Sequence, residues 1–374
     1  MSVPPIRPGS VLDNKWILLD KIGKGTYSEI YTARTAVDPT TVAVKVEHRN
    51  TGLKLVLQTE SSILKEMQPY SCAAKWIDFQ SNPSYDYLVM EILGKSISQV
   101  KDTYPNHQFD MRTASSIILQ VLSCVKQLHD TGYIHRDIKP SNFVFGTGML
   151  KNKIYIIDFG LCRQWKKDDL IYEARPKAQF RGTTLYASPN SHLEKELGRR
   201  DDMYSVLFMF IDIGLPWRNE SVSNKKLAVE IKRKFINNLE EEINKLTNLP
   251  YKDIFIKIFK HIETLSFKDS PDYSFISEQI KLMNPIDNKH TSSYIPGSIE
   301  HYKDWKERAT HILKETSNLA KVKELLDEAN KQTEFYFIDP DGSAQILYSH
   351  LKRSTSDLPS IESFTEKRVQ FGDY

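Results

Sequence analysis

The sequence predicts an α+β fold with two lobes: a small N-terminal lobe of strands with one helix, and a larger C-terminal lobe of helices. Between residues 16 and 93, short apolar runs typical of strands are separated by turn residues, and one stretch has helical periodicity. From residue 111 to about residue 283, the apolar residues recur mainly at helical spacing. With 374 residues, the chain is long enough for one large two-lobed unit or for two ordinary domains.

The composition is that of a soluble globular protein, with 40% hydrophobic and 26% charged residues. A net charge of +3 gives no support to binding of nucleic acid or of a membrane surface. The longest apolar run, residues 203–217, is interrupted by Asp212 and Pro216 and is shorter than the ~20 residues of a membrane span. Three widely spaced cysteines are typical of reduced thiols. We therefore expect a monomeric intracellular protein, cytoplasmic or nuclear, with no membrane and no specific nucleic-acid partner.

The N-terminal stretch predicts a leader, a strand and a glycine-containing turn. Residues 1–14 have three prolines and no apolar core, so we expect a disordered leader rather than a signal peptide. A strand over residues 16–19 leads to Gly23 and Gly25, which allow a tight turn and a close approach of backbone amides to phosphate. An ordinary hairpin turn fits these glycines equally well. Ser28 stands where a nucleotide-binding loop usually has a third glycine, and it is small enough for the loop to close.

A lysine and a glutamate in this lobe predict an ion pair. Lys45 lies in an alternating strand over residues 42–46, and Glu60 lies in the middle of an apolar helical stripe within residues 54–68. A carboxylate on an apolar stripe is costly to bury unless it is paired, and Lys45 is the natural partner. Such a pair would direct the ammonium group at the phosphates of a nucleotide.

The connection between the lobes is expected near Gly94. A strand over residues 87–93 ends there, and the pattern changes from strand to helix. We expect backbone groups at this connection to meet the edge of an adenine. A strong helical pattern then runs from Met111 to His129, and Gly132 ends it.

The stretch from His135 to Asn142, His-Arg-Asp-Ile-Lys-Pro-Ser-Asn, carries more reactive groups than a turn requires. Asp137 supplies a carboxylate and Lys139 an ammonium group, Asn142 supplies a carboxamide, and Pro140 stiffens the loop. Phosphoryl transfer requires a carboxylate to accept the proton of a hydroxyl, a cation near the moving phosphate and an oxygen ligand for Mg²⁺. The spacing is similar to that of the protein-kinase catalytic loop.

Two short strands, residues 143–145 and 154–157, follow this loop. Asn142 precedes the first strand and Asp158 follows the second, so antiparallel pairing would bring their side chains together. Both side chains offer the oxygen ligands that Mg²⁺ prefers. The Asp-Phe-Gly that begins at Asp158 would by itself fit a simple turn, but together with the catalytic loop it predicts a magnesium site.

The rest of this lobe is predicted to be a long loop followed by helices. Residues 161–200 are polar and loop-like. Asp202 then precedes an apolar helix over residues 203–213, of the kind buried in a lobe core, and helices continue to about Met283. We expect Asp202 to cap that helix and to brace the backbone of the catalytic loop.

The C-terminal part predicts an extension beyond the two lobes. A polar linker over residues 285–297 precedes an extension over 298–350, with one or two helices and a β-hairpin that turns at residues 339–342. The helices would pack on the large lobe or bind a partner. Because an isolated hairpin is only marginally stable, we expect it to dock on the main body or on a partner. Residues 351–374 are predicted to be a flexible tail.

Together these motifs resemble a eukaryotic protein kinase over residues 15–290, with the N-lobe over 15–93 and the C-lobe over 94–290. Lys139 and the pair Gly182-Thr183 are similar to Ser/Thr kinases rather than Tyr kinases. The long interval from the catalytic loop to the Asp-Phe-Gly motif resembles the casein kinase 1 superfamily. In place of Ala-Pro-Glu the chain has Tyr186-Ala187-Ser188-Pro189-Asn190, which is similar to the Ser-Ile-Asn of that superfamily. The motifs most similar to its tau-tubulin kinase branch are Phe180-Arg181-Gly182-Thr183, Leu197-Gly198-Arg199-Arg200-Asp201-Asp202 and Leu215-Pro216-Trp217-Arg218.

This resemblance implies a kinase that transfers the γ-phosphate of Mg-ATP to Ser or Thr hydroxyls of protein substrates. Asp137 would be the catalytic base and Lys139 would steady the phosphate. Asn142 and Asp158 would bind Mg²⁺, and Lys45 with Glu60 would position the α- and β-phosphates. Residues expected around the nucleotide are Ile22, Gly23, Gly25, Ser28, Ile30, Ala43, Lys45, Met90 (the gatekeeper), Glu91 and Leu93 (at the adenine edge) and Val144. His135, Phe159 and Leu64 would stack in the column that links the lobes.

Two further positions depart from the superfamily pattern. Leu185 replaces an arginine that contributes to a basic pocket for pre-phosphorylated substrates, and Arg181, Arg199 or Arg200 could supply that charge instead. Pro189 restricts the backbone where a substrate peptide would lie.

The rival interpretation is a catalytically weak scaffold with a kinase fold that acts by binding partners. Such a chain usually lacks the equivalents of Lys45, Asp137 or Asp158, and all three are present here. A kinase for small alcohols fits less well, because the long segment 161–200 suits a face that binds a peptide.

Overall fold

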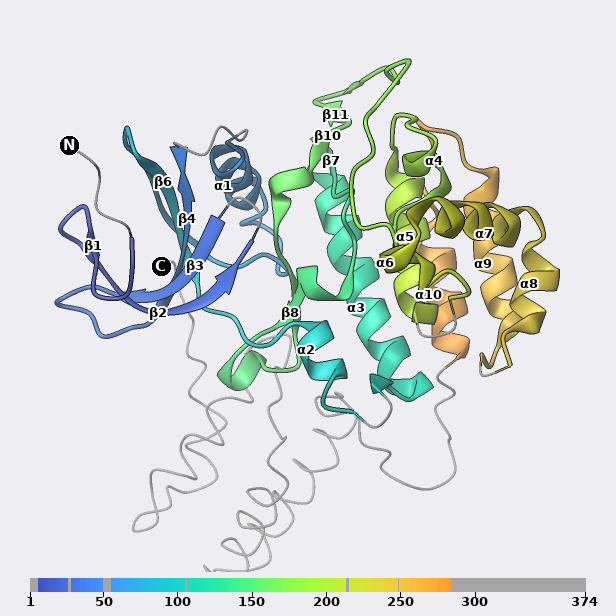
Figure 1. Cartoon of the computed structure of the whole chain (residues 1–374), viewed down its shortest axis with the longest axis horizontal. Coiled ribbons are helices and arrows are strands. Elements are labelled where there is room, and N and C mark those ends of the chain that lie inside the picture. The colour runs from blue at the N-terminus through green and yellow to red at the C-terminus, as the bar shows by residue number, and fades with distance from the viewer. Residues whose placement is uncertain are drawn as a thin grey trace, which may run out of the picture. The chain divides into compact units, whose positions relative to one another are not determined.

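The computed structural model describes residues 6–25, 28–49, 55–104, 107–212, 215–247 and 249–283 (Figure 1). Contacts divide the chain into two compact units, and of the described residues only 146–152 belong to the second unit. Within that second unit, Gly148–Leu150 form the short 3₁₀ helix η4. The predicted linker, the extension over residues 298–350 and the tail over 351–374 lie outside the described residues.

An antiparallel sheet and helix α1 (Leu57–Glu66) form the N-terminal lobe. In β4, Val42, Val44 and Val46 pack into the core of this lobe. Side chains alternate along a strand, so Lys45 faces the other way, where it pairs with Glu60 of α1. The strands, in the spatial order β1-β2-β3-β4-β6-β5, are β1 (Val11–Leu12), β2 (Trp16–Lys24), β3 (Ser28–Arg34), β4 (Val42–His48), β6 (Tyr85–Glu91) and β5 (Trp76–Ser81).

The prediction of a disordered leader over residues 1–14 is wrong for its last part. Residues 11–12 form β1 and pair with residues 16–17 of β2, and Leu12 is buried. The turn between these strands contains Asp13 and Asn14 at φ values of 47° and 54°. Asp and Asn tolerate this left-handed conformation better than most residues, so the turn returns the chain to the sheet edge.

Helices build the C-terminal lobe around the buried helix α5 (Arg199–Ile211). All side chains from Asp201 to Ile211 are buried, as expected for a helix without a solvent-facing side. The ring of Phe208 in α5 lies 5.1 Å from that of Trp217, centroid to centroid. The other helices are α2 (Ile97–Lys101), α3 (Met111–Asp130), α4 (Pro189–His192), α6 (Glu220–Ser223), α7 (Lys225–Asn237), α8 (Leu239–Lys245), α9 (Lys252–Thr264) and α10 (Tyr273–Leu282).

Two details of the C-terminal lobe differ from the prediction. The helix expected from residue 203 begins at Arg199, because Asp201 closes its first turn by accepting the N–H of Gly198 at 2.8 Å. Residues 161–200, expected to be loop-like, contain short strands and a short helix, which are too short to show a periodic pattern, and one of these strands pairs with a distant segment. These elements are β10 (Arg163–Gln164), which pairs with β7 (Tyr133–Ile134), the hairpin of β11 (Lys166–Lys167) and β12 (Leu170–Ile171), and α4.

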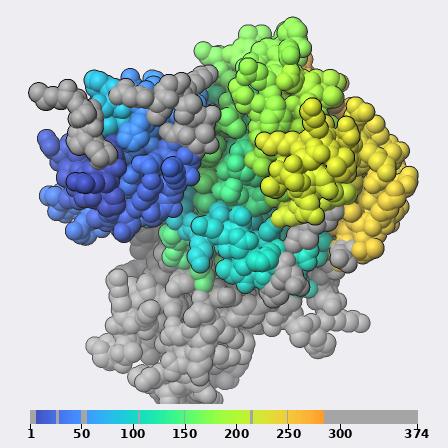
Figure 2. Space-filling model, in the orientation of Figure 1, coloured from blue at the N-terminus to red at the C-terminus, as the bar shows by residue number. Residues whose placement is uncertain are grey.

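The two lobes are joined between β6 and α2, and Figure 2 shows the N-terminal lobe in blue beside the C-terminal lobe in green and yellow. The N–H of Gly94 donates to the carbonyl of Phe145 at 2.7 Å, and the N–H of Phe145 donates to Lys95 at 2.9 Å. No helix in the described part of the chain is both long and apolar enough to pass through a lipid bilayer. The predicted α+β fold with two lobes is confirmed.

Candidate active site

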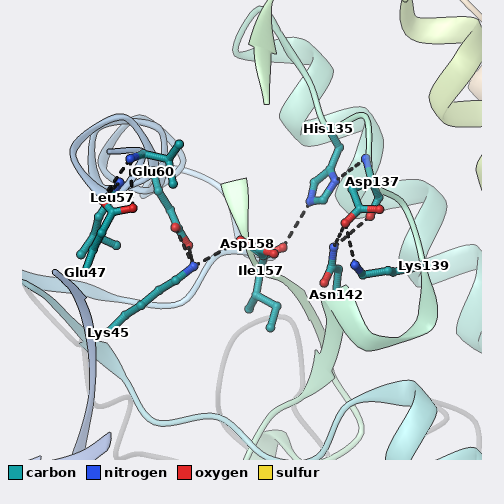
Figure 3. A network of polar contacts seen from close by, with 11 residues as sticks. Lys45, Glu47, Leu57, Glu60, His135, Asp137, Lys139, Asn142, Ile157 and Asp158 are labelled. Atoms are coloured by element: carbon teal, nitrogen blue, oxygen red, sulfur yellow. Dashed lines mark hydrogen bonds and ion pairs between the residues drawn. The ribbon is translucent and has the colours of Figure 1, made fainter. Parts of the chain in front are cut away.

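Asp137 receives hydrogen bonds on both carboxylate oxygens, and Figure 3 shows those from Lys139 and Asn142. Lys139 Nζ donates to Oδ2 at 2.6 Å, and Asn142 Nδ2 donates to Oδ2 at 3.3 Å and to the backbone carbonyl of Asp137 at 2.9 Å. The hydroxyl of Thr183 donates to Oδ1 at 2.8 Å. Asp137 is 7% exposed. A buried carboxylate with both oxygens held has the fixed orientation that a general base requires.

Asp202 holds the backbone of the catalytic loop from helix α5. Its carboxylate accepts the N–H groups of His135 at 2.7 Å and of Arg136 at 2.9 Å, and Nε2 of His129 lies 2.8 Å from it. Burial by itself raises the pKa of Asp202, but the hydrogen bond and charge of His129 outweigh it and hold the pKa below its ordinary value. The predicted bracing of the loop is present, whereas the cap of the helix is formed by Asp201.

Lys45 lies between two carboxylates that come from different lobes. Its Nζ is 2.7 and 2.6 Å from the two carboxylate oxygens of Glu60 and 3.2 Å from Oδ1 of Asp158. Burial by itself lowers the pKa of Lys45, but the charges of Glu60 and Asp158 raise it above its ordinary value. The predicted ion pair is therefore present, and Asp158 joins it.

Glu47 is a further supporting residue, which the sequence interpretation missed. Its carboxylate accepts the N–H of Val56 at 3.0 Å and of Leu57 at 2.9 Å, at the N-terminus of α1 (Figure 3 shows the Leu57 contact). A negative charge there stabilises the helix that carries Glu60. The available signal was its position two residues after Lys45, which places both side chains on the same face of β4.

Asn142 and Asp158, the predicted Mg²⁺ ligands, lie at one end of the antiparallel pair of β8 (Phe143–Phe145) and β9 (Ile154–Ile156). The N–H of Ile157 donates to the carbonyl of Asn142 at 3.0 Å. The side chain of Asp158 is 45% exposed, and although burial raises its pKa, the charge of Lys45 holds the pKa below its ordinary value. Asn142 uses its amide nitrogen on Asp137, which leaves its amide oxygen for a cation. One carboxylate and one amide oxygen fit Mg²⁺, which completes its shell with water and phosphate oxygens.

Strand pairing gathers the predicted nucleotide-binding residues of the N-terminal lobe around Lys45. Gly23 on β2 is opposite Ile30 on β3, and Ile30 is opposite Lys45 on β4. Ala43 on β4 is opposite Met90 on β6. The remaining predicted residues are Ile22, Gly25 and Ser28 on or beside the hairpin of β2 and β3, Glu91 at the end of β6, Leu93 in the connection between lobes and Val144 on β8. The hairpin interpretation of the glycines is confirmed, because β2 and β3 pair across them, and their role in covering a nucleotide stays a prediction.

Gly182 and Thr183 were not predicted as site residues, yet they complete the surroundings of Asp137. Gly182 has a φ of +96°, and a Cβ there would lie 2.6 Å from the carbonyl oxygen of Arg136. Only glycine allows this close approach, which brings the hydroxyl of Thr183 to Asp137. The pair Gly182-Thr183 is visible in the sequence, where it indicates a Ser/Thr kinase but does not reveal a contact with Asp137.

Comparison with known proteins shows the family of this chain. A family model described as the protein kinase domain matches residues 16–293. A probable serine/threonine-protein kinase of Dictyostelium discoideum is 36% identical over 275 residues, which is 72% of this chain and 53% of that relative. The chain therefore spans about half the length of this curated relative. Because the family match covers most of the chain and includes every residue of the site, this protein belongs to the protein kinase domain family.

Proposed function

We propose that this protein is a serine/threonine protein kinase that transfers the γ-phosphate of Mg-ATP to hydroxyl groups of protein substrates. The observation that carries the proposal is the orientation of Asp137 by Lys139, Asn142 and Thr183. The name of the Dictyostelium relative supports it. Since the chain spans about half of that relative, the activity is inferred from the site.

In this proposal Asp137 orients the substrate hydroxyl and accepts its proton as the new bond from that oxygen to the γ-phosphorus forms. The bond from the γ-phosphorus to the β–γ bridging oxygen breaks, and ADP leaves. The Nζ of Lys139, which lies 2.6 Å from Oδ2 of Asp137, would supply positive charge next to the transferred phosphate. Thr183 and Asn142 keep the carboxylate from rotating. Because Asp137 is buried, these electrostatic interactions are stronger than they would be in bulk water.

The same proposal assigns the nucleotide to the hairpin and strands around Lys45. Lys45, aligned by Glu60, would hold the α- and β-phosphates, and Asn142 and Asp158 would hold Mg²⁺. The ion, when bound, neutralises charge on the phosphate oxygens. The backbone at Gly23 and Gly25 would cover the phosphates, and the backbone of residues 91–93 would meet the adenine.

The decisive experiment is magnesium-dependent transfer of phosphate from ATP to a generic Ser/Thr protein. We expect Asp137→Asn to lower the rate by at least ~10²-fold, because the proton acceptor is lost. Asp38→Asn, at an exposed aspartate in the turn between β3 and β4, is the matched control and should keep the wild-type rate. Equal rates for wild type and Asp137→Asn would contradict the proposal and favour the scaffold.

We also propose that the chain belongs to the casein kinase 1 superfamily and lies nearest to its tau-tubulin kinase-like branch. Support comes from the segment that replaces Ala-Pro-Glu. Ser188 and Asn190 both donate to Oδ1 of Asp201, at 2.7 and 2.9 Å. These two residues of the variant motif thus attach the segment to the start of α5.

We further infer that the substrates do not require a priming phosphate. Leu185 packs against the hydrophobic core instead of offering a cation. Arg199 donates to the carbonyl of Lys268 at 2.9 Å, and Arg200 donates to that of Leu265. Of the three arginines that could replace the missing charge, only Arg181 is exposed. A peptide library with and without phosphoserine tests this: a strong preference for phosphorylated peptides would contradict it.

A further inference from the structure

The segment over residues 183–188 connects the catalytic carboxylate to the face where a peptide substrate would bind. It begins at Thr183, which donates to Asp137. The N–H groups of Tyr186 and Ala187 both donate to the carbonyl of Thr183 at 2.9 Å, forming a tight turn. It ends at Ser188, which is tied to α5. The carbonyl groups of Thr184, Leu185 and Ala187 lie in this segment, and the directions in which they point define its backbone conformation.

A single ammonium group binds these three carbonyl groups. Lys232 of α7 donates to the carbonyls of Thr184 at 2.8 Å, Leu185 at 3.2 Å and Ala187 at 2.7 Å. Three carbonyl oxygens match the three N–H bonds of an ammonium group. Lys232 is 1% exposed, so it does not also serve as a solubilising surface charge.

The surroundings of Lys232 are aromatic and uncharged. Its Nζ lies 5.0 Å from the ring centroid of Phe208 and 5.1 Å from that of Trp217, which are cation–π distances. Among the described residues, no carboxylate is paired with Lys232, and burial alone shifts its pKa. His192 Nε2 is 3.2 Å away, and burial together with the charge of Lys232 lowers the pKa of His192 to about 4, so that this ring is neutral.

The energetic balance argues for a positioning role. Burial lowers the pKa of Lys232 well below its ordinary value, while the carbonyl dipoles oppose this by favouring the charged form. A buried cation without a counter-ion is a poor means of stabilising a core, since an apolar side chain of similar volume would pack there at lower cost. What an apolar side chain cannot do is satisfy three carbonyl groups at once.

We propose that Lys232 is the positioning residue that sets the backbone of residues 183–188, and thereby the binding of the acceptor peptide and the placement of Thr183 on Asp137. This rests on the proposed kinase activity. Trp217 assists, because its indole N–H donates to the carbonyl of Leu185 at 2.8 Å. The hydrogen-bond partners of Lys232 include none of the residues that we assign to the nucleotide.

The test compares Lys232→Met with Lys234→Met, an exposed lysine two positions along α7. We expect Lys232→Met to raise the KM for a peptide substrate by about 10-fold or more, because buried carbonyls lose their donor, and to leave the KM for ATP within about twofold. Hydrogen exchange at the amides of Tyr186 and Ala187 should accelerate in the same variant. Lys234→Met should change neither quantity.

Two outcomes would overturn the role of Lys232. One is an unchanged peptide KM with unchanged amide exchange, and the other is an equal rise of both KM values, which would mean that the substitution disturbs the nucleotide site as much as residues 183–188. If Lys232→Met does not fold, Lys232→Arg and Trp217→Phe replace it; the first should retain much of the peptide affinity and the second should lose part of it. A wild-type protein that transfers no phosphate would refute the kinase proposal, while the exchange rates would still decide whether Lys232 shapes the segment.

Discussion

At the scale of single residues, the orientation of Asp137 depends on donors from separate parts of the chain. Lys139 and Asn142 follow it in the same loop, whereas Thr183 comes from a segment 46 positions later. The loop alone therefore constrains one carboxylate oxygen, and the second is constrained only when the later segment is in place. Gly182 makes that placement possible, since it lets the segment touch the carbonyl of Arg136.

We predict that Gly182→Ala lowers kcat/KM for a protein substrate by roughly 10-fold or more. The added methyl group would lie 2.6 Å from the carbonyl oxygen of Arg136, so the segment must shift away from Asp137. The left-handed φ of +96° adds strain of about 1–2 kcal/mol. Steady-state kinetics measures the effect. Gly9→Ala is the control, because Gly9 has a φ of +88° with no atom near its Cβ position; equal activity of both variants would count against the steric explanation.

At the scale of elements, two side chains of β4 hold helix α1 in position. Lys45 and Glu47 project from the same face of β4: the first pairs with Glu60 in α1, and the second caps the N-terminus of α1. The residue before the helix, Val56, offers no side-chain cap of its own. The strand thus supplies the missing cap and fixes the helix at the distance where Glu60 meets Lys45.

We predict that Glu47→Ala weakens ATP binding although Glu47 touches no nucleotide. Removal of its carboxylate leaves the N–H of Leu57 buried without an acceptor, so the free energy of unfolding should fall by about 1–2 kcal/mol. With α1 loosened, Glu60 no longer aligns Lys45, and the KM for ATP should rise several-fold. Urea unfolding and ATP titration measure the two effects. Glu66→Ala, at the exposed C-terminal end of α1, serves as the control; an identical KM for ATP in both variants would refute the coupling.

At the scale of the whole described unit, buried charged groups connect the lobes and the segments around the catalytic loop. Lys45 of the N-terminal lobe binds Asp158 of the C-terminal lobe. The rings of His135 and Phe159 meet edge to face with centroids 6.2 Å apart, and Phe159 and Leu64 belong to the same hydrophobic core. The stacking of all three in one column between the lobes stays a prediction. Arg136 donates to the carbonyl of Leu161 at 2.7 Å, which ties the catalytic loop to the chain after Asp158.

Glu196 connects two further parts of the chain, because it contacts Arg163 and Arg175. Its side chain, 2% exposed, lies 3.0 Å from Nε of Arg163 and 3.1 Å from a terminal nitrogen of Arg175. Burial by itself raises the pKa of Glu196, but Arg175 and Arg163 outweigh it and hold the pKa below its ordinary value. This carboxylate therefore joins β10, beside the catalytic loop, to residues 172–178.

We predict that Glu196→Gln lowers the free energy of unfolding by about 1–3 kcal/mol at pH 7. A carboxylate with a depressed pKa contributes its stability above the unfolded value of 4.5, and loses it as the pH falls through the lower folded value. The difference between wild type and Glu196→Gln should therefore shrink below about pH 4.5. Urea titrations from pH 7 to pH 3 measure it. Glu194→Gln, at an exposed pair with Lys177, should leave the free energy of unfolding nearly unchanged. If the difference in free energy of unfolding between wild type and Glu196→Gln stayed constant with pH, the ionised carboxylate of Glu196 would not be the source of the stability.

Much of the site could be predicted from sequence, because its key groups sit in short motifs with strong local patterns. Asp137, Lys139 and Asn142 lie within one turn of chain, and Lys45 and Glu60 stand out against apolar neighbours. The residues that were missed, Glu47, Gly182 and Thr183, act only through partners far along the chain. Likewise β1 was missed because its short length carries no periodicity, and its pairing with β2 is decided by the turn at Asp13 and Asn14.

The sequence by itself determined the class of fold, the order of its elements and the chemical groups that the site would use. Periodicity and spacing reflect local backbone preferences, and these survive without knowledge of distant contacts. Only the tertiary structure decided what holds each group in place. The hydrogen bonds of Asp202 to the catalytic loop, of Glu47 to α1 and of Lys232 to residues 184–187 join atoms that are close in space but not in sequence. A buried polar group takes whichever partner the packing brings within reach, and local patterning does not encode that choice.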